Sequence, residues 1–220
     1  TGGAIGYKRR MGETSKVSFP RRTAAKARTR QRIEDAARHL FVTLGYADAT
    51  MAAIADAADI HITTLFTHFA SKRDLIAAIA ERARTRFENV VATQREQGVP
   101  VLIFWRNQVT RIAHAYERDG DGQINLARAL AGEPELLPVW FAHQRLQIDL
   151  MTDYIADELG IDPATDHRAQ MAAAMLVAGG RMAFDSWIES GRVHDLVAEN
   201  ERLLDAAEAL LANGLPLSRG

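Results

Sequence analysis

Apolar residues recur at steps of three and four along almost the whole chain after residue 22. Between Ile33 and Leu44 this spacing defines one face of a helix, and Gly45 follows as a stop signal. The alternating apolar and polar runs that a sheet needs do not occur in the sequence. The chain is therefore predicted to be all-α. After the N-terminal helices, further helices are expected near 101–118, 124–131, 135–159, 164–190 and 195–212.

The composition excludes several classes of protein. The 220 residues contain no cysteine, so the chain can form no disulfide, thiolate metal site or cysteine nucleophile. Its longest charge-free apolar stretch lies between Arg168 and Arg181, well short of the roughly 20 residues that a membrane-spanning helix requires. Basic residues near the start are not followed by an apolar region, so no secretory signal is expected. We expect a soluble, cytoplasmic protein with no membrane partner.

The charge is distributed unevenly. Up to Arg32 there are ten basic residues against Glu13 alone, whereas the rest of the chain is acidic and the net charge is −1. Residues 1–22 are rich in glycine and lack periodicity, so they are predicted to form a flexible basic tail. A basic end on an otherwise acidic protein indicates a polyanionic partner. The alternative is a solvated tail whose charge is incidental.

Two short helices are expected after Gly45, and a longer one follows them. Thr50 can cap the first, and the second places Leu65 and Phe69 on one side. Ser71 and Asp74 resemble a capping box that opens a long amphipathic helix. A helix followed by two short helices and a tight turn indicates a helix-turn-helix unit. The predicted divisions are 23–70 for this DNA-binding domain, 71–97 for a connecting helix and 98–220 for a helical effector-binding and dimerisation domain.

The segment from Thr50 to Leu75 resembles the DNA-binding region of TetR-family transcriptional regulators. The resemblance implies an N-terminal helix-turn-helix domain, a C-terminal ligand-binding and dimerisation domain, and repression as the default. It rests on Gly45 and Tyr46, Thr50, Ile54 and Ala55, Leu65, Phe66, His68 and Phe69, and Ser71 and Lys72.

Three positions depart from the family pattern. Asp59 replaces the glycine of the turn and is expected to adopt the positive φ that the glycine would supply. His61 replaces the serine that opens the second short helix. Phe66 replaces a tyrosine, which removes a hydroxyl that could contact a phosphate.

Burial of Ile62, Leu65 and Phe69 would leave short polar side chains facing outward, where they could read a double-stranded DNA operator in the major groove. Thr50 and Lys72, at the starts of helices, are expected to hold phosphates. Basic residues placed just before the first helix are expected to follow the DNA backbone or enter the minor groove. A threonine-rich surface helix is the alternative. The candidate DNA-binding residues are Lys26, Arg28, Arg30, Thr50, His61, Thr63, Thr64, Thr67, His68 and Lys72.

The last two helices are predicted to form a homodimer. Apolar pairs recur every seven residues at Leu196/Val197, Leu203/Leu204 and Leu210/Leu211, a stripe wider than one neighbour requires. Gly179 and Gly180 lie within the preceding helix and indicate a close approach between helices. The family resemblance implies the same four-helix interface. The alternative is an intramolecular core.

Aromatic residues and methionines between Val101 and Trp187 have polar neighbours at helical spacing, a pattern typical of an apolar pocket for a small effector. For any single residue, core packing is the alternative. The candidate effector-binding residues are Phe104, Trp105, Gln108, His114, Trp140, Phe141, His143, Gln147, Met151, Met175 and Phe184.

No motif of an enzyme, cofactor site or metal site occurs in the sequence. We expect a ligand-responsive DNA-binding transcriptional regulator: a repressor that binds a palindromic operator as a dimer and is released by a small apolar effector. The alternative is a helical small-molecule-binding or scaffold protein without specific DNA binding.

Overall fold

The computed structural model describes residues 20–119, 124, 127 and 132–213. Within these residues there are helices and no strand, so the all-α prediction is confirmed. The predicted tail lies almost entirely outside the described residues, as does most of the helix expected near 124–131. The helices are α1 (Pro20–Thr43), α2 (Met51–Ala57), α3 (Ile62–His68), α4 (Lys72–Glu96), α5 (Val101–Asp119), α7 (Leu137–Leu159), α8 (Arg168–Glu189) and α9 (Leu196–Asn213).

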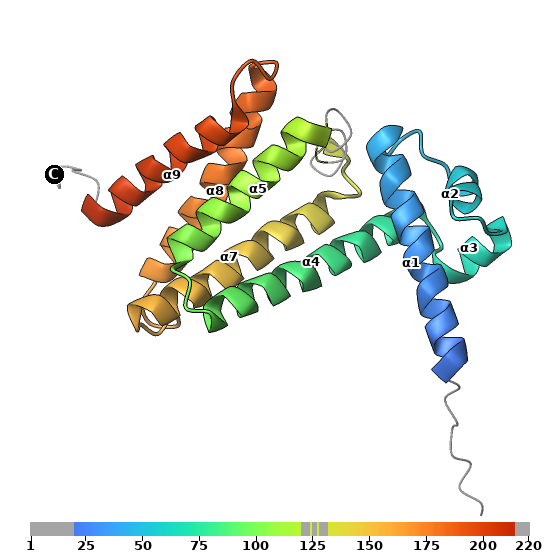
Figure 1. Ribbon diagram of the computed structural model, residues 1–220, viewed down its shortest axis with the longest axis horizontal. Helices are drawn as coiled ribbons and strands as arrows, with labels where there is room; N and C mark the ends of the chain where they lie inside the picture. The colour runs from blue at the N-terminus through green and yellow to red at the C-terminus, as the bar shows by residue number, and fades with distance from the viewer. Residues whose placement is uncertain (1–19, 120–123, 125–126, 128–131, 214–220) are drawn as a thin grey trace, which may run out of the picture.

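The molecule has two helical parts joined by one long helix. Figure 1 shows α1, α2 and α3 gathered at one end, and α5, α7, α8 and α9 stacked at the other. The 25-residue α4 begins beside α3 and runs alongside α7 to the far end of the larger part. No helix within the described part is both long enough and apolar enough to cross a membrane.

Local sequence signals fix the ends of the N-terminal helices. The Thr50 hydroxyl accepts a hydrogen bond from the Ala53 amide, and the Ser71 hydroxyl accepts one from the Asp74 amide, so both predicted caps are confirmed. Asp59 has a φ of 50°, as predicted for the glycine position of the turn. The Arg32 guanidinium donates to the Asp59 carbonyl at 3.1 Å and so ties this turn to α1.

The apolar core of the N-terminal part includes a residue from a distant part of the sequence. Ile33, Phe41, Ile54 and Leu65 are fully buried in one cluster, and the same cluster contains Leu136, which immediately precedes α7. A second, larger cluster joins α4, α5, α7, α8 and α9. The N-terminal part therefore shares its core with the start of α7.

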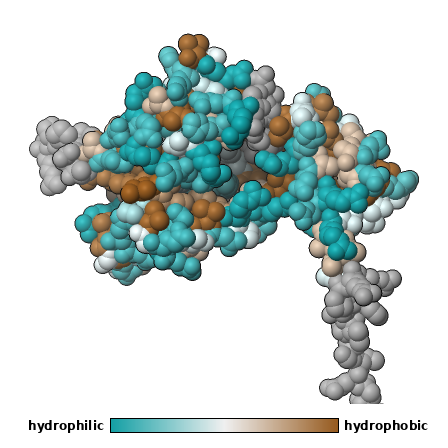
Figure 2. Space-filling model, in the orientation of Figure 1, coloured by the Kyte–Doolittle hydropathy of each residue, from teal (hydrophilic) through white to brown (hydrophobic). Residues whose placement is uncertain are grey.

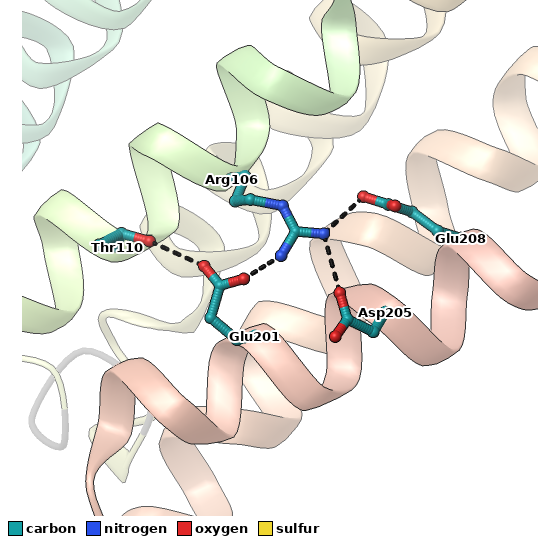
Figure 3. Close-up of polar contacts among 5 residues, drawn as sticks. All are labelled: Arg106, Thr110, Glu201, Asp205 and Glu208. Carbon is teal, nitrogen blue, oxygen red and sulfur yellow. Dashed lines mark hydrogen bonds and ion pairs between the residues drawn. The ribbon is translucent and has the colours of Figure 1, made fainter.

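An ion-pair network fixes α9 against α5. The Arg106 guanidinium, from α5, contacts three carboxylates of α9: it pairs with Glu201, lies 3.0 Å from the Asp205 carboxylate, and lies 2.7 Å from that of Glu208 (Figure 3). The Thr110 hydroxyl donates to Glu201 at 3.4 Å. One cation thus offsets the mutual repulsion of three acidic side chains on one helix face.

We expect Arg106→Gln to lower the free energy of unfolding by about 1 kcal/mol, because partly exposed ion pairs are individually weak but this cation serves three partners. Urea denaturation measures the change, which should shrink at high salt. Arg202→Gln is the matched control, because among the described residues the exposed Arg202 has one ion pair, with the half-buried Glu199 of its own helix. Equal stability of the two variants would contradict the network's role.

Candidate DNA-binding surface and effector pocket

Helix α3 presents a polar and aromatic surface to solvent. Leu65 and Phe69 are buried against the N-terminal core, whereas Thr63, Phe66 and Thr67 are exposed. Two of the predicted outward residues, Thr64 and His68, are half-buried, because seven residues of helix allow only a narrow face to be fully exposed. The surface is therefore centred on Thr63, Phe66 and Thr67.

His61 caps α3 in place of the usual serine. Its Nδ1 atom accepts a hydrogen bond from the Thr63 amide at 3.3 Å, and it lies 2.8 Å from the Thr63 hydroxyl. An imidazole nitrogen thus satisfies a free N–H group at the start of the helix. This contact also orients the Thr63 side chain.

His68, at the end of α3, is electrically neutral in this environment. Burial, together with the nearby Lys26 and Arg30 charges, holds the pKa of His68 below its ordinary value. Its Nδ1 atom is buried and has no hydrogen-bond partner among the described residues. Arg30 stacks over the Phe69 ring at 4.2 Å and pairs with Glu34 at 3.2 Å, so it holds α1 against the end of α3.

The predicted basic arm is part of a helix. Lys26, Arg28 and Arg30 were expected before the first helix, and this placement is wrong because α1 begins at Pro20. A proline at the first position of a helix loses no hydrogen bond there, which makes it a start signal rather than a sign of a loop. Lys26 and Arg28 are exposed on the first turns of α1.

Lys72 makes contacts that the sequence did not indicate. Its ammonium group donates to the carbonyl oxygens of Tyr46 at 2.7 Å and Ala47 at 3.0 Å, and lies 4.7 Å from the centre of the Tyr46 ring. The Tyr46 hydroxyl in turn donates to Glu135 at 2.7 Å, and burial raises the pKa of Tyr46. Lys72 therefore joins the start of α4 to the turn before α2, and the Thr50 hydroxyl is occupied by its cap.

A cavity of about 170 Å³ lies inside the larger helical part, between α5, α7, α8 and α9. Five of the predicted effector-binding residues line it: Trp105, Trp140, His143, Gln147 and Phe184. The Trp105 indole donates to the Leu176 carbonyl at 3.2 Å, which fixes one wall. Burial lowers the pKa of His143, so this imidazole is neutral. We call this cavity the effector pocket.

The structure does not bring the other six predicted residues into the effector pocket. Phe104 and Met151 pack in the larger core, and Gln108 is buried beside them and accepts from Arg111 at 3.0 Å. Phe104 is turned away from the cavity by its position beside Trp105, and Met151 lies one turn beyond Gln147, the last residue of α7 that lines the cavity. His114 and Phe141 point outward.

The remaining predicted residue, Met175, lines a different cavity, of about 670 Å³, between the ends of α5, α7, α8 and α9. Apolar side chains gather there, away from the N-terminal part (Figure 2).

Several polar residues of the effector pocket were missed by the sequence analysis, namely Tyr116, Gln144, Arg181 and Asn200. Spacing would have located one of them, because Val177, Gly180, Arg181 and Phe184 follow the three-and-four step of one helix face.

Taken together, the fold and its two sites define a class. One of the three N-terminal helices, the short α3, has an exposed polar face. The long α4 connects these helices to a helical bundle, and a cavity lies within that bundle. This is the organisation of a helix-turn-helix regulator with a ligand-binding domain.

Comparison with known proteins matches the N-terminal part to a family of regulators. Residues 33–83 match the model of bacterial regulatory proteins of the tetR family. The chain is 28% identical over 166 residues to the transcriptional regulator TcmR of Streptomyces glaucescens, covering 73% of each chain. It is 28% identical over 190 residues to the transcriptional activator FasR of Mycolicibacterium smegmatis, covering 84% of this chain and 83% of FasR. The fold resembles FadR from Bacillus subtilis in complex with stearoyl-CoA, with a TM-score of 0.58, 17% identity, and coverage of 84% and 98%. Residues 33–83 therefore match this family, and the relatives and the solved structure to which the chain is similar over most of its length are transcriptional regulators.

Proposed function

We propose that this regulator is a repressor that binds a palindromic operator as a homodimer in the cytoplasm and is released when a small, largely apolar effector enters the effector pocket. The observation that carries the proposal is the surface of α3. Leu65 and Phe69 anchor the helix, and the exposed Thr63, Phe66 and Thr67 give it methyl, hydroxyl and aromatic groups that suit a major groove. The exposed Lys26 and Arg28 on α1 supply cations for the adjacent phosphates.

Exposed apolar side chains on α8 and α9 support the proposed dimer. Met171 and Met182 on α8, and Leu210 and Leu211 on α9, are all exposed in the single chain. The predicted apolar stripe on α9 is partly internal, because Leu204 is only 4% exposed and packs in the chain's own core. The exposed Leu210 and Leu211 are the part of the stripe that remains for a partner. A Cβ atom added at Gly180 would lie 3.5 Å from a side-chain carbon of Val109 on α5, so this glycine faces the chain's own core.

A direct path by which an effector could release DNA runs through α7. Trp140 lines the effector pocket, and one turn earlier Leu136 is fully buried in the N-terminal core. An effector that displaces Trp140 would therefore also move Leu136, and with it the packing of the N-terminal core that supports α3. To release DNA, it must bind more tightly to the conformation in which the two α3 helices no longer fit adjacent major grooves.

The DNA-binding proposal predicts different effects for two substitutions. Thr67→Ala should alter the base preference at one position of each half-site, because it removes a methyl and a hydroxyl from the exposed face. Arg28→Gln should weaken binding to all sequences about equally and reduce the salt-dependence slope by about 0.9, because it removes one phosphate contact. Fluorescence anisotropy with a library of duplexes at several salt concentrations measures both effects.

Arg145→Gln is the matched control, because Arg145 is an exposed arginine on α7, far from α1 in the sequence. It should leave both the base preference and the slope unchanged. Wild-type behaviour of both Thr67→Ala and Arg28→Gln at physiological salt would refute the proposed docking of α3.

A further inference from the structure

Arg181 places an unsatisfied cationic donor in the wall of the effector pocket. Its Nε atom donates to the Asp185 carboxylate at 2.6 Å, one turn along α8. Its Nη1 atom is buried and has no hydrogen-bond partner among the described residues. Buried guanidinium N–H groups are almost always paired, and a missing acceptor lowers stability unless a bound group supplies it. The Nη1 atom of Arg181 can therefore donate a hydrogen bond to an acceptor on a bound ligand.

The described residues that line the pocket include no acidic side chain that could serve as this acceptor. Among the described residues that line it, Arg181 is the one formal cation and there is no aspartate or glutamate. His143 is neutral there, and burial raises the pKa of Tyr116, which keeps its hydroxyl protonated. Asp185 lies outside the lining and is occupied by Nε. Asp185 balances the charge of Arg181 but leaves its Nη1 donor unpaired, and a charged ligand oxygen makes a stronger hydrogen bond to this donor than a neutral one does.

Aromatic rings surround the free donor. The Arg181 guanidinium carbon lies 4.8 Å from the centre of the Trp140 ring and 5.9 Å from that of Phe184. Tyr116 packs against Phe184 with ring centres 4.8 Å apart, and Trp105 closes another side. Flat side chains at these positions suit a flat ligand, because aromatic rings pack best offset or edge to face.

The size of the cavity sets the size of the ligand. An apolar cavity of about 150 Å³ holds benzene, and the effector pocket has a volume of about 170 Å³. This volume matches one ring, or two with a small adjustment of the pocket walls.

We propose that the effector is an aromatic carboxylate of one or two rings, whose ring lies among Trp140, Phe184 and Tyr116 and whose carboxylate accepts hydrogen bonds from Nη1 of Arg181. This inference rests on the proposed function of the pocket and names the class of ligand that it takes. A carboxylate there completes the hydrogen bonding of Arg181 on the side that Asp185 leaves free.

Calorimetry on the free protein tests the proposal with two pairs of probes, benzoate with benzamide and 2-naphthoate with 2-naphthamide. Each acid should bind roughly 10- to 100-fold more tightly than its amide, the effect of a hydrogen bond to a charged group. Arg181→Met should abolish this preference. Arg145→Met is the matched control, because Arg145 pairs with Asp149 at the same four-residue spacing but on exposed surface. It should retain the full preference.

Arg181→Gln is a second variant and should give the same loss, so the proposal does not depend on the folding of one substitution. An amide that binds as tightly as its acid would overturn the proposal, as would a preference that survives in both Arg181 variants or the failure of all four probes to bind at millimolar concentration. The proposed function fails separately, through the operator-binding measurements on Thr67→Ala and Arg28→Gln or through an acid that binds without weakening operator affinity.

Discussion

Met182→Glu is expected to convert the protein to a monomer and to lower operator affinity by about 10²–10⁴-fold, the gain that linking two half-site contacts provides. Met182 is 60% exposed on the α8 face proposed for dimerisation. In a two-fold interface each surface residue occurs twice, so one substitution places two unpaired carboxylates in an apolar contact. The two α3 helices would then no longer be held about 34–36 Å apart. Light scattering and operator titration measure the two effects.

Phe141→Glu is the matched control, because Phe141 is also an apolar residue that is 60% exposed, but it lies on α7 outside the proposed interface. This variant should keep the oligomeric state and operator affinity of the original protein. A Met182→Glu protein that remains dimeric, or an original protein that is monomeric at micromolar concentration, would rule out the interface.

Leu65→Ala is expected to lower the free energy of unfolding by about 2–5 kcal/mol, because it leaves a cavity where a fully buried side chain anchors α3. Operator affinity should fall as well, because α3, which carries the exposed residues, would no longer be packed firmly against the N-terminal core. Urea denaturation followed by circular dichroism measures the loss of stability.

The adjacent Phe66→Ala separates stability from recognition. Phe66 is 52% exposed, so its removal should change stability by less than about 0.5 kcal/mol while weakening operator binding. If Leu65→Ala unfolded at the same urea concentration as Phe66→Ala, the assignment of inward and outward faces on α3 would be wrong.

Local features were predictable from the sequence because they depend on neighbouring residues. The caps at Thr50 and Ser71 and the positive φ of Asp59 each follow from a few consecutive side chains, and the structure contains all three. The start of α1 was misplaced because glycine and serine before Pro20 resemble a loop, although proline also begins helices.

Contacts between distant segments were not predictable in the same way. The bond from Lys72 to the Tyr46 carbonyl joins residues 26 positions apart, and no periodic pattern encodes it. For the effector pocket, composition located the correct helices, but the rotation of each helix decided whether a residue reached the cavity. Trp105 lines the pocket and its neighbour Phe104 lies in the core. Arg181 was missed because its charge resembles that of an exposed helix position.

The burial of Leu136 in the N-terminal core has a consequence for how such a protein can change in evolution. The core of the N-terminal part is completed by Leu136, which lies in sequence just before α7 of the larger helical part. The hydrogen bond from Tyr46 to Glu135 adds a second contact between the two parts. A chimera that joined residues 20–97 to the sensor of another regulator would leave an unfilled hole unless the new sensor supplied an equivalent leucine. Exchange of the whole C-terminal part is therefore expected to destabilise the N-terminal part, whereas substitutions around Trp140 and Arg181 leave the Leu136 contact in place.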